Sequence, residues 1–417
     1  MAFGALGVLA TLPGQTTGVS VFTDHLIQAL GLTRVRLSTA YMAGTLMSAF
    51  FMTRAGRLYD RIGVRPAGAG AALGLALCLL IFSRMDSVVS FLTALFGGGT
   101  LVSAVVAFIC ASLGFLGIRF FGQGALTLVS RTMVMRWFES RRGRVAAVMG
   151  IATAAGFSYA PRMLQTLINT AGWRGAWTVL ALILMSVVLP MILVFFRDSP
   201  EACGMTMEQG LRESAKGKAS RNILAEDSTL AQARKDPRYW AYALLLAWWA
   251  LFNTAFTFHV VDLFASRGVD AETAVSIFLP ITMVSVTCNI LGSWLSDSMD
   301  LPPFYFLAVL GLGAAGLALF NPAAVWSKPV LIAGLGVSSG LWSVLNNISW
   351  PRLFGRKHLG EISGSAMSLL VAGSALGPVI FSVLKTEAGY NYAGLFGILG
   401  PVCLLVLGIR AFVRKSS

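Results

Sequence analysis

The hydrophobic and polar positions of this chain alternate on the scale of whole helices. Stretches of roughly 20 apolar residues, separated by short polar segments, recur along all 417 residues, and each is long enough to cross a bilayer. We therefore expect an all-α polytopic membrane protein with twelve transmembrane helices. They are expected at about 3–30, 37–57, 66–85, 103–131, 144–169, 174–196, 239–266, 271–297, 302–321, 327–352, 359–386 and 390–413.

A polar, cation-rich segment divides this pattern into two halves. We expect an N-terminal six-helix bundle at 1–196, a cytoplasmic linker at 197–238 and a C-terminal six-helix bundle at 239–417. The stretch at 3–30 has no cationic region before it and no small-residue cleavage site, so we interpret it as a retained helix and not a signal peptide.

The two halves look like diverged, pseudo-symmetric repeats, as expected for a transporter built from two six-helix units. Thr17 corresponds to Thr254 and Asp60 to Asp297, with the intervening spacing preserved. Further along, the N-terminal half carries about 21 extra residues within 87–118, enough to cross a membrane alone. A thirteenth span would place the Arg-rich segment 136–144 outside, which the positive-inside rule opposes. We expect an extended third or fourth helix, or a broken external hairpin.

Composition and charge agree with a membrane protein. Hydrophobic residues make up 56% and charged residues 12%, against about 25% charged in soluble proteins. The net charge of +14 comes mainly from Lys and Arg in the predicted cytoplasmic segments. This bias predicts a multi-pass membrane protein with both termini in the cytoplasm, in contact with lipid and not with nucleic acid.

No motif for chemistry is present. The five Cys residues show neither CxxC nor metal-ligand spacing, and there is no Walker loop or dinucleotide fingerprint. A nucleophile paired with a base is also missing. We expect no enzyme activity, no cofactor and no metal.

The segment between the second and third helices carries the most specific motif. It contains Gly56, Asp60, Arg61 and Gly63 in the pattern Gly-x-Leu-x-Asp-Arg-x-Gly. This pattern resembles the corresponding loop of the major facilitator superfamily of transporters. The resemblance implies that these four residues form a conformational latch and that the protein works by alternating access. The alternative is a cationic turn that only sets the topology.

Arg119 in the fourth helix is the most unusual charge. It lies about 18 Å along the helix from Arg131, near the middle of a ~30 Å hydrocarbon core. A cation at that depth is expensive unless it faces the protein interior and has partners. Two interpretations stay open: a structural or proton-linked charge common to the superfamily, and a direct ligand of an anion.

Other polar residues cluster in matched helices of the two halves. With Arg119, the residues expected to line the substrate site are Gln15, Thr17, Asn253, Thr254, Asn289 and, as an apolar wall, Trp342. The alternative for each is ordinary helix packing. The candidates for proton coupling are Asp24, His25, His259 and Asp262, although all four could simply be solvated at the membrane surface. Arg162 is a candidate for an external vestibule or a snorkelling side chain.

Three stretches narrow the resemblance to one branch. Segments 14–22, 136–143 and 375–378 resemble bacterial relatives of the monocarboxylate and oxalate:formate transporters. That branch usually places an Arg in the eighth helix to bind the substrate carboxylate, but the matching residue here is Asn289. The resemblance then implies that Arg119 supplies the cation, or that the substrate is not a simple carboxylate.

The sequence therefore predicts a secondary active transporter of a small organic anion, monocarboxylate-like and proton-coupled. Its partners would be the substrate, protons and the lipid bilayer, and we expect a monomer. Two alternatives remain: an exporter of a neutral or amphipathic molecule in which Arg119 is structural, and a non-transporting receptor or accessory membrane subunit.

Overall fold

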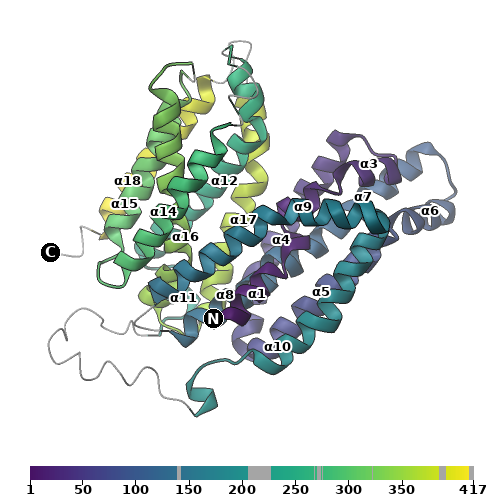
Figure 1. The fold of residues 1–417 in the computed structure, drawn as a ribbon, viewed down its shortest axis with the longest axis horizontal. Helices are drawn as coiled ribbons and strands as arrows, with labels where there is room; N and C mark the ends of the chain where they lie inside the picture. The colour runs from purple at the N-terminus through teal and green to yellow at the C-terminus, as the bar shows by residue number, and fades with distance from the viewer. Residues whose placement is uncertain are drawn as a thin grey trace. The chain divides into compact units, whose positions relative to one another are not determined.

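The computed structural model describes residues 1–138, 142–204, 227–266, 268–269, 274, 276–321, 323–384 and 391–412. Within these ranges the chain is helical and has no β-strand (Figure 1). In the same ranges, eight helical runs are long and apolar enough to cross a membrane, and two shorter apolar helices accompany them. Each of the twelve expected helices overlaps an observed helix or a run of consecutive helices, which confirms the all-α prediction.

The chain divides into two compact units. Unit 1 contains Met1–Trp137, Ile151–Met207 and Ser363–Ser368, and unit 2 contains Phe138–Gly150, Glu208–Ile362 and Leu369–Ser417. The start of the fifth expected helix thus belongs to unit 2, and a short piece of the eleventh belongs to unit 1. Short segments of each sequence half are therefore packed with the other.

Unit 1 begins with a broken helix, because Pro13 and Gly14 interrupt the first apolar stretch. Longer helices follow, two of them continuing through π-helical turns. The elements are α1 (Ala2–Leu9), η1 (Leu12–Gly14), α2 (Thr16–Ser20), α3 (Thr23–Leu30), α4 (Arg34–Ile62), α5 (Val64–Ser83), α6 (Met85–Leu95), α7 (Thr100–Ile118), η2 (Arg119–Leu126), α8 (Thr127–Trp137), α9 (Arg142–Ile183), η3 (Leu184–Val188), α10 (Leu189–Phe195) and η4 (Glu201–Cys203). The start of α9, up to Gly150, belongs to unit 2.

Glycines make the sharp joints of unit 1. Gly63 has φ +84° and is the single residue between α4 and α5, a conformation that a side chain would disfavour. Gly97, Gly98 and Gly99 all have positive φ and separate α6 from α7. The segment 87–118 is therefore folded as most of α6, a glycine turn and α7. At Gly172, with φ +70°, the helical run of α9 is kinked.

Unit 2 is built from long helices in tight contact. Helix α14 packs against α16, and α15 packs against both α16 and α18. The elements are α11 (Leu230–Ala233), α12 (Pro237–Ala265), α14 (Phe278–Ser296), α15 (Pro302–Ala318), α16 (Ser327–Phe354), α17 (Leu359–Leu384) and α18 (Asn391–Phe412). Small residues allow close approach: a Cβ on Gly316 would lie 2.4 Å from the carbonyl carbon of Gly397.

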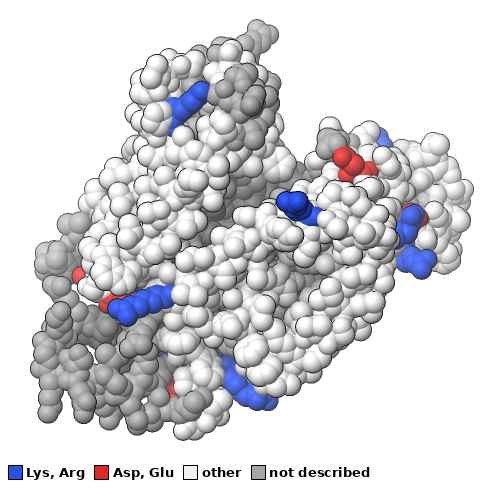
Figure 2. Space-filling model, viewed as in Figure 1, with Lys and Arg blue, Asp and Glu red and all other residues white. Residues whose placement is uncertain are grey.

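Large apolar side chains point outward on both units. Phe50, Leu101 and Val383 are each more than 70% exposed. Figure 2 shows a face that is mostly uncharged, with Lys and Arg in a few separate patches. An apolar exterior of this kind is what a bilayer requires of spanning helices.

Candidate functional site

Arg119 lies at the joint between α7 and α8, where the helix changes from α to π. It is the first residue of η2, and its side chain is 2% exposed. The π-helical turns widen the helix, and the Thr127 hydroxyl donates to the Gly122 carbonyl at 3.2 Å. Single π-helical segments inside spanning helices are frequent at functional sites because they re-aim side chains.

The break in the first helix faces this joint. The turn of η1 is followed by Gln15, whose backbone is extended at φ −83° and ψ 156°. Residues Gly18 and Val19 then donate their backbone N–H groups to the Gln15 carbonyl. The Gly14 carbonyl, released from the helix, accepts from Arg119 Nη1 at 3.1 Å. The helix break therefore supplies an acceptor for the buried cation.

Gly14 allows the two broken segments to touch. A Cβ at Gly14 would lie 2.4 Å from the Ile118 carbonyl oxygen and 2.8 Å from the Gly122 Cα. A Cβ at Gly122 would in turn meet the Gly14 Cα at 2.9 Å. Because these contacts are to backbone, any side chain at either glycine would push the helices apart.

Three groups surround the Arg119 guanidinium. Besides Gly14, Nη1 donates to the Thr16 hydroxyl at 3.3 Å, and the guanidinium carbon lies 5.2 Å from the centre of the Tyr41 ring. The Tyr41 hydroxyl is 2.9 Å from the Thr16 hydroxyl. We call Gly14, Thr16, Tyr41 and Arg119 the Arg119 cluster.

The Arg119 cluster contains no negative charge. Among the described residues no carboxylate lies within ion-pair distance of Arg119, and its Nε–H is buried without an acceptor. A guanidinium has five N–H donors, and the neutral groups here use only part of them. The cluster is therefore a buried cation with spare donors, which is a suitable partner for an anion.

Gln15 lies beside the Arg119 cluster. Its Nε2 donates to the Thr11 hydroxyl at 2.8 Å and lies 3.5 Å from the Thr127 hydroxyl. Gln15 thus ties the broken first helix to α8. Thr17, two residues further along, is exposed, and its carbonyl accepts from the Ser20 hydroxyl. The structure brings Gln15 and Arg119 into one region of unit 1.

In unit 2, Trp342, the expected apolar wall of the site, stacks on Trp249, which the sequence did not single out. The rings of Trp249 and Trp342 stack at 4.2 Å, joining α12 to α16. Trp249 Nε1 donates to the Ser339 hydroxyl and Trp342 Nε1 to the Leu246 carbonyl. Asn253 lies one helical turn beyond Trp249 on α12, on the same face.

Asn289 and Thr254 occupy helix-packing positions. Asn289 is 8% exposed, and its Nδ2 lies 3.4 Å from the Gly340 carbonyl of α16. A Cβ at Gly150 would be 2.9 Å from its Oδ1, so little space surrounds this amide. The Thr254 hydroxyl is 3.0 Å from the Ser374 hydroxyl of α17. These contacts join helices within unit 2.

The four proton-coupling candidates lie in two places. Asp24 and His25 are on α3 of unit 1, with Asp24 exposed and His25 partly buried. His259 on α12 contacts α17 of unit 2, while the side chain of Asp262 lies outside the described part of the chain. Arg162, the vestibule candidate, has an exposed side chain on α9.

The motif Gly56–Gly63 was expected between two helices, but it forms the last turns of α4 and the glycine that follows them. Asp60 forms an ion pair with Arg136, with side chains only 8% and 12% exposed, and the Arg136 guanidinium lies 4.6 Å from the centre of the Tyr59 ring. Gly56 packs within unit 1 against Gly364, where a Cβ would lie 3.3 Å from the Gly56 Cα. The Arg61 side chain is exposed.

Asp198 makes a structural contact near the motif that the sequence did not indicate. It follows α10, and its Oδ1 accepts from the Val64 backbone N–H at 2.8 Å, which caps the start of α5. The space beside Gly63 is filled by the same carboxylate. The only sign of this contact in the sequence was that Asp198 is a charged residue directly after the sixth expected span.

We expect Asp198→Ala to lower the free energy of unfolding by about 1 kcal/mol, the usual effect of losing a helix cap. Thermal unfolding in detergent measures this. Asp300→Ala is the matched control, because Asp300 is 72% exposed and its pairing with Arg352 at 3.7 Å contributes little. Equal thermal midpoints for the two variants would contradict the capping role.

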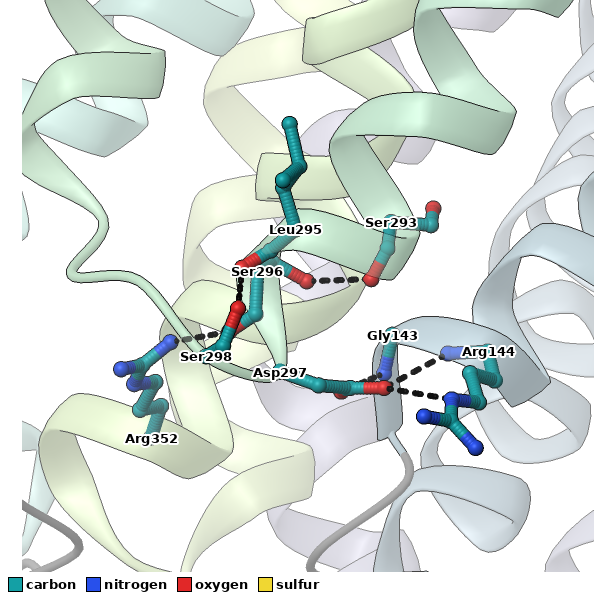
Figure 3. A network of polar contacts seen from close by, with 8 residues as sticks. All are labelled: Gly143, Arg144, Ser293, Leu295, Ser296, Asp297, Ser298 and Arg352. Carbon is teal, nitrogen blue, oxygen red and sulfur yellow. Dashed lines mark hydrogen bonds and ion pairs between the residues drawn. The ribbon is translucent and has the colours of Figure 1, made fainter.

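Asp297, the counterpart of Asp60, binds the start of α9 within unit 2 (Figure 3). Its Oδ1 accepts from the Gly143 backbone N–H at 2.7 Å, and its Oδ2 lies 3.3 Å from the Arg144 backbone N and 3.8 Å from Arg144 Nε. A Cβ at Gly143 would lie 1.8 Å from the Ser293 carbonyl oxygen, so only glycine fits. The carboxylate therefore caps the N-terminus of α9.

Arg352 contacts the C-terminal end of α14, directly before Asp297. Its Nη1 donates to the Ser296 carbonyl at 2.7 Å, as Figure 3 also shows. The latch residues expected from the sequence all lie in the first copy of the motif. In the structure, the second copy also makes specific contacts, with a backbone segment 153 residues away in sequence.

Burial raises the pKa of Asp297, although the hydrogen bonds from Gly143 and Arg144 act in the opposite direction. The folded protein therefore keeps a proton that the unfolded chain has already lost, so stability falls as the pH rises from about 4 through the folded pKa. We expect the thermal midpoint of the wild type to fall relative to Asp297→Asn over this range. A rise in the relative thermal midpoint would mean that the hydrogen bonds lower the pKa of Asp297 more than burial raises it.

Comparison with known proteins places the chain in a family. The model of the Major Facilitator Superfamily matches residues 3–378. The chain belongs to the Major Facilitator Superfamily. This superfamily consists of membrane transporters and not enzymes, and its fold is the expected one of twelve helices in two six-helix bundles.

Two relatives and one solved structure illustrate the match. The chain is 24% identical to a probable sulfoacetate transporter of Cupriavidus necator, over 94% of this chain and 87% of the relative. It is 25% identical to human monocarboxylate transporter 11, over 79% and 71% of the two chains. A bacterial homologue of the iron transporter ferroportin superposes with a TM-score of 0.70 at 16% identity, over 98% of both chains, which shows the fold.

Proposed function

We propose that this superfamily member transports a small organic anion by alternating access, and that its anion binds at the Arg119 cluster. The observation that carries the proposal is a guanidinium 2% exposed with no carboxylate near it in the described structure and a buried Nε–H without an acceptor. An isolated buried cation is costly, and a bound anion would remove that cost.

The chemistry of the cluster favours a ligand that carries a carboxylate or sulfonate group. A carboxylate or sulfonate can accept two parallel hydrogen bonds from a guanidinium, and the Thr16 and Tyr41 hydroxyls can donate to a further oxygen. The two relatives named for sulfoacetate and monocarboxylates support a ligand of this class. Thr17, Asn253, Thr254, Asn289 and Trp342 stay in the proposal as polar and apolar lining.

Proton coupling and topology complete the proposal. We propose symport with a proton, a bacterial inner-membrane location, both termini in the cytoplasm, and halves at 1–196 and 239–417 joined by the linker at 197–238. Gly56, Asp60, Arg61 and Gly63 would act as the latch, with Arg162 in the vestibule. The protein would act as a monomer without a nucleic-acid partner.

Uptake by proteoliposomes tests this function. The purified protein is reconstituted, and labelled small carboxylates and sulfoacetate are offered with and without an inward proton gradient. The proposal predicts saturable uptake that the gradient increases. Uptake that is saturable but insensitive to the gradient would remove proton coupling only, and no uptake or exchange of any anion would contradict the function.

A second candidate function is export of a neutral or amphipathic molecule. It is favoured by the fact that Arg119 already contacts Gly14, Thr16 and Tyr41, so it could serve only to hold the broken first helix against α7 and α8. In that case the protein would lose stability when Arg119 is replaced, and anions would not compete for its site.

A further inference from the structure

Helices α12 and α17 share a seam with almost no space between the backbones. A Cβ at Gly373 would lie 2.4 Å from the Ala247 carbonyl oxygen, and one at Gly377 would lie 2.3 Å from the Leu251 carbonyl oxygen. We call this contact the α12–α17 seam. Both helices belong to unit 2 along the seam, so it is a feature of one compact unit.

Two polar contacts continue the seam beyond the glycines. The first is the 3.0 Å contact between the Thr254 and Ser374 hydroxyls. The second lies further along, where His259 Nε2 is 3.0 Å from the Ser382 hydroxyl. The His259 ring also lies 6.2 Å from the ring of Phe381, so aromatic packing helps to hold its position.

The positions of the protons on His259 and Ser382 decide which of their contacts are hydrogen bonds. His259 Nδ1 is 3.0 Å from the Ala255 carbonyl oxygen, His259 Nε2 is 3.0 Å from the Ser382 Oγ, and the Ser382 hydroxyl donates to the Pro378 carbonyl at 2.9 Å. A carbonyl can only accept. The Ala255 contact therefore requires a proton on Nδ1, and the Pro378 contact uses the single hydroxyl proton of Ser382.

The remaining contact then requires a proton on Nε2. With both ring nitrogens protonated, all three contacts are hydrogen bonds at once. In the neutral ring with the proton on Nδ1, the Ser382 hydroxyl must choose between Nε2 and the Pro378 carbonyl, so one bond is lost. With the proton on Nε2 instead, the Ala255 contact has no hydrogen. The geometry is complete only for the imidazolium.

We propose that His259 and Ser382 form a proton-binding site in which the imidazolium ties α12 to α17. The inference deepens the proposed proton-coupled transport and rests on it for its role, although the binding itself can be measured without transport. Proton uptake adds a charge-assisted hydrogen bond between the helices, and proton release removes it. The seam is thereby tighter in the protonated protein.

Within the described part of the chain, the ionisable groups on the helices around His259 are few. On its own helix the next is Asp262, three residues on, whose side chain lies outside the described part. The described part of α17 carries a titratable side chain only at Glu361, close to the opposite end of that helix. The other helices that pack against α12 carry Tyr305 on α15, Lys328 and Arg352 on α16, and Tyr392, Cys403 and Arg410 on α18.

Nuclear magnetic resonance of labelled histidine measures the proton count directly. The chain has three His residues, so His25→Gln with His358→Gln leaves His259 as the single signal. Imidazole nitrogen shifts distinguish a ring with two protons from either neutral tautomer. Spectra are recorded in lipid nanodiscs from about pH 5 to 9, the range in which histidine normally titrates.

We expect His259 to hold two protons at the acidic end of this range, with both N–H groups hydrogen-bonded. Ser382→Ala removes the acceptor of the Nε2–H, so the protonation constant should fall about tenfold, as expected for one hydrogen bond to a charged donor. Ser382→Thr keeps the hydroxyl, so this variant should have the protonation constant of the wild type. Ser374→Ala, which removes the neighbouring hydroxyl contact of the same seam, is the matched control and should leave it unchanged.

The inference is overturned if His259 stays neutral throughout the range, or if Ser382→Ala and Ser374→Ala have the same effect. Its role in coupling has a separate test in proteoliposomes. His259→Gln should keep anion exchange but lose the response of uptake to the proton gradient. A variant that keeps that response contradicts the coupling role, whereas absence of anion exchange in the wild type contradicts the proposed function.

Discussion

Arg119→Gln is expected to weaken binding of the transported anion by at least about 100-fold, equivalent to about 2.7 kcal/mol. The substitution removes the guanidinium of the Arg119 cluster, and two charge-assisted hydrogen bonds to an anion contribute roughly this much. Arg119→Lys keeps the charge but not the planar fork, so it should recover only part of the affinity. Binding is measured by thermal shift or calorimetry with small carboxylates and sulfoacetate.

The same variant separates a ligand-binding Arg119 from a structural one. If the guanidinium serves to bind an anion, the unliganded Arg119→Gln protein should unfold at the same temperature as the wild type or higher, because a buried cation has been removed. If Arg119 mainly holds Gly14 and Thr16, the midpoint should fall. Arg84→Gln, an exposed Arg at the joint of α5 and α6, is the control for loss of one positive charge.

Asp60→Ala is expected to lower the free energy of unfolding by about 3–5 kcal/mol, the usual effect of breaking a buried ion pair from one side. The Arg136 side chain would be left 12% exposed without its carboxylate partner at this position. Thermal or denaturant unfolding in detergent measures the loss. The double variant Asp60→Ala with Arg136→Leu should be more stable than the sum of the single effects, because no charge is then stranded.

Asp86→Asn provides the comparison within the same unit. Asp86 pairs with Arg174, but these side chains are 26% and 50% exposed, so its loss should cost less than about 1 kcal/mol. If the two aspartate substitutions had similar effects, or if the double variant were additive, the Asp60–Arg136 pair would not be the anchor of the motif.

Much of the fold could be predicted because hydrophobic length alone indicates a spanning helix. The break near the linker followed from charge, which is a local signal, whereas the second and third helices were expected to end at 57 and begin at 66 but meet at Gly63. The first helix was different: one span was expected at 3–30, but the chain forms several short helices there, and this split depends on Gly14 touching Gly122 on another helix. Contacts between distant segments leave no local pattern.

The candidate site was predictable in part for the same reason. Arg119 stood out because a cation is rare in the middle of an apolar stretch, whereas the π-helical turn that aims it has no sequence signature. Asn289 was chosen by alignment, but alignment does not show that its amide lies against Gly340. Asp198 and Asp297 act through backbone N–H groups far away in sequence, which only the folded chain brings together.

The central claim is that Arg119 binds the transported anion, and counterflow in proteoliposomes tests it most directly. Vesicles containing the wild type or Arg119→Gln are preloaded with an unlabelled small carboxylate or sulfoacetate, and exchange with the labelled anion is followed without any proton gradient. We predict rapid, saturable exchange for the wild type and almost none for the variant. Equal exchange by both proteins would contradict the account.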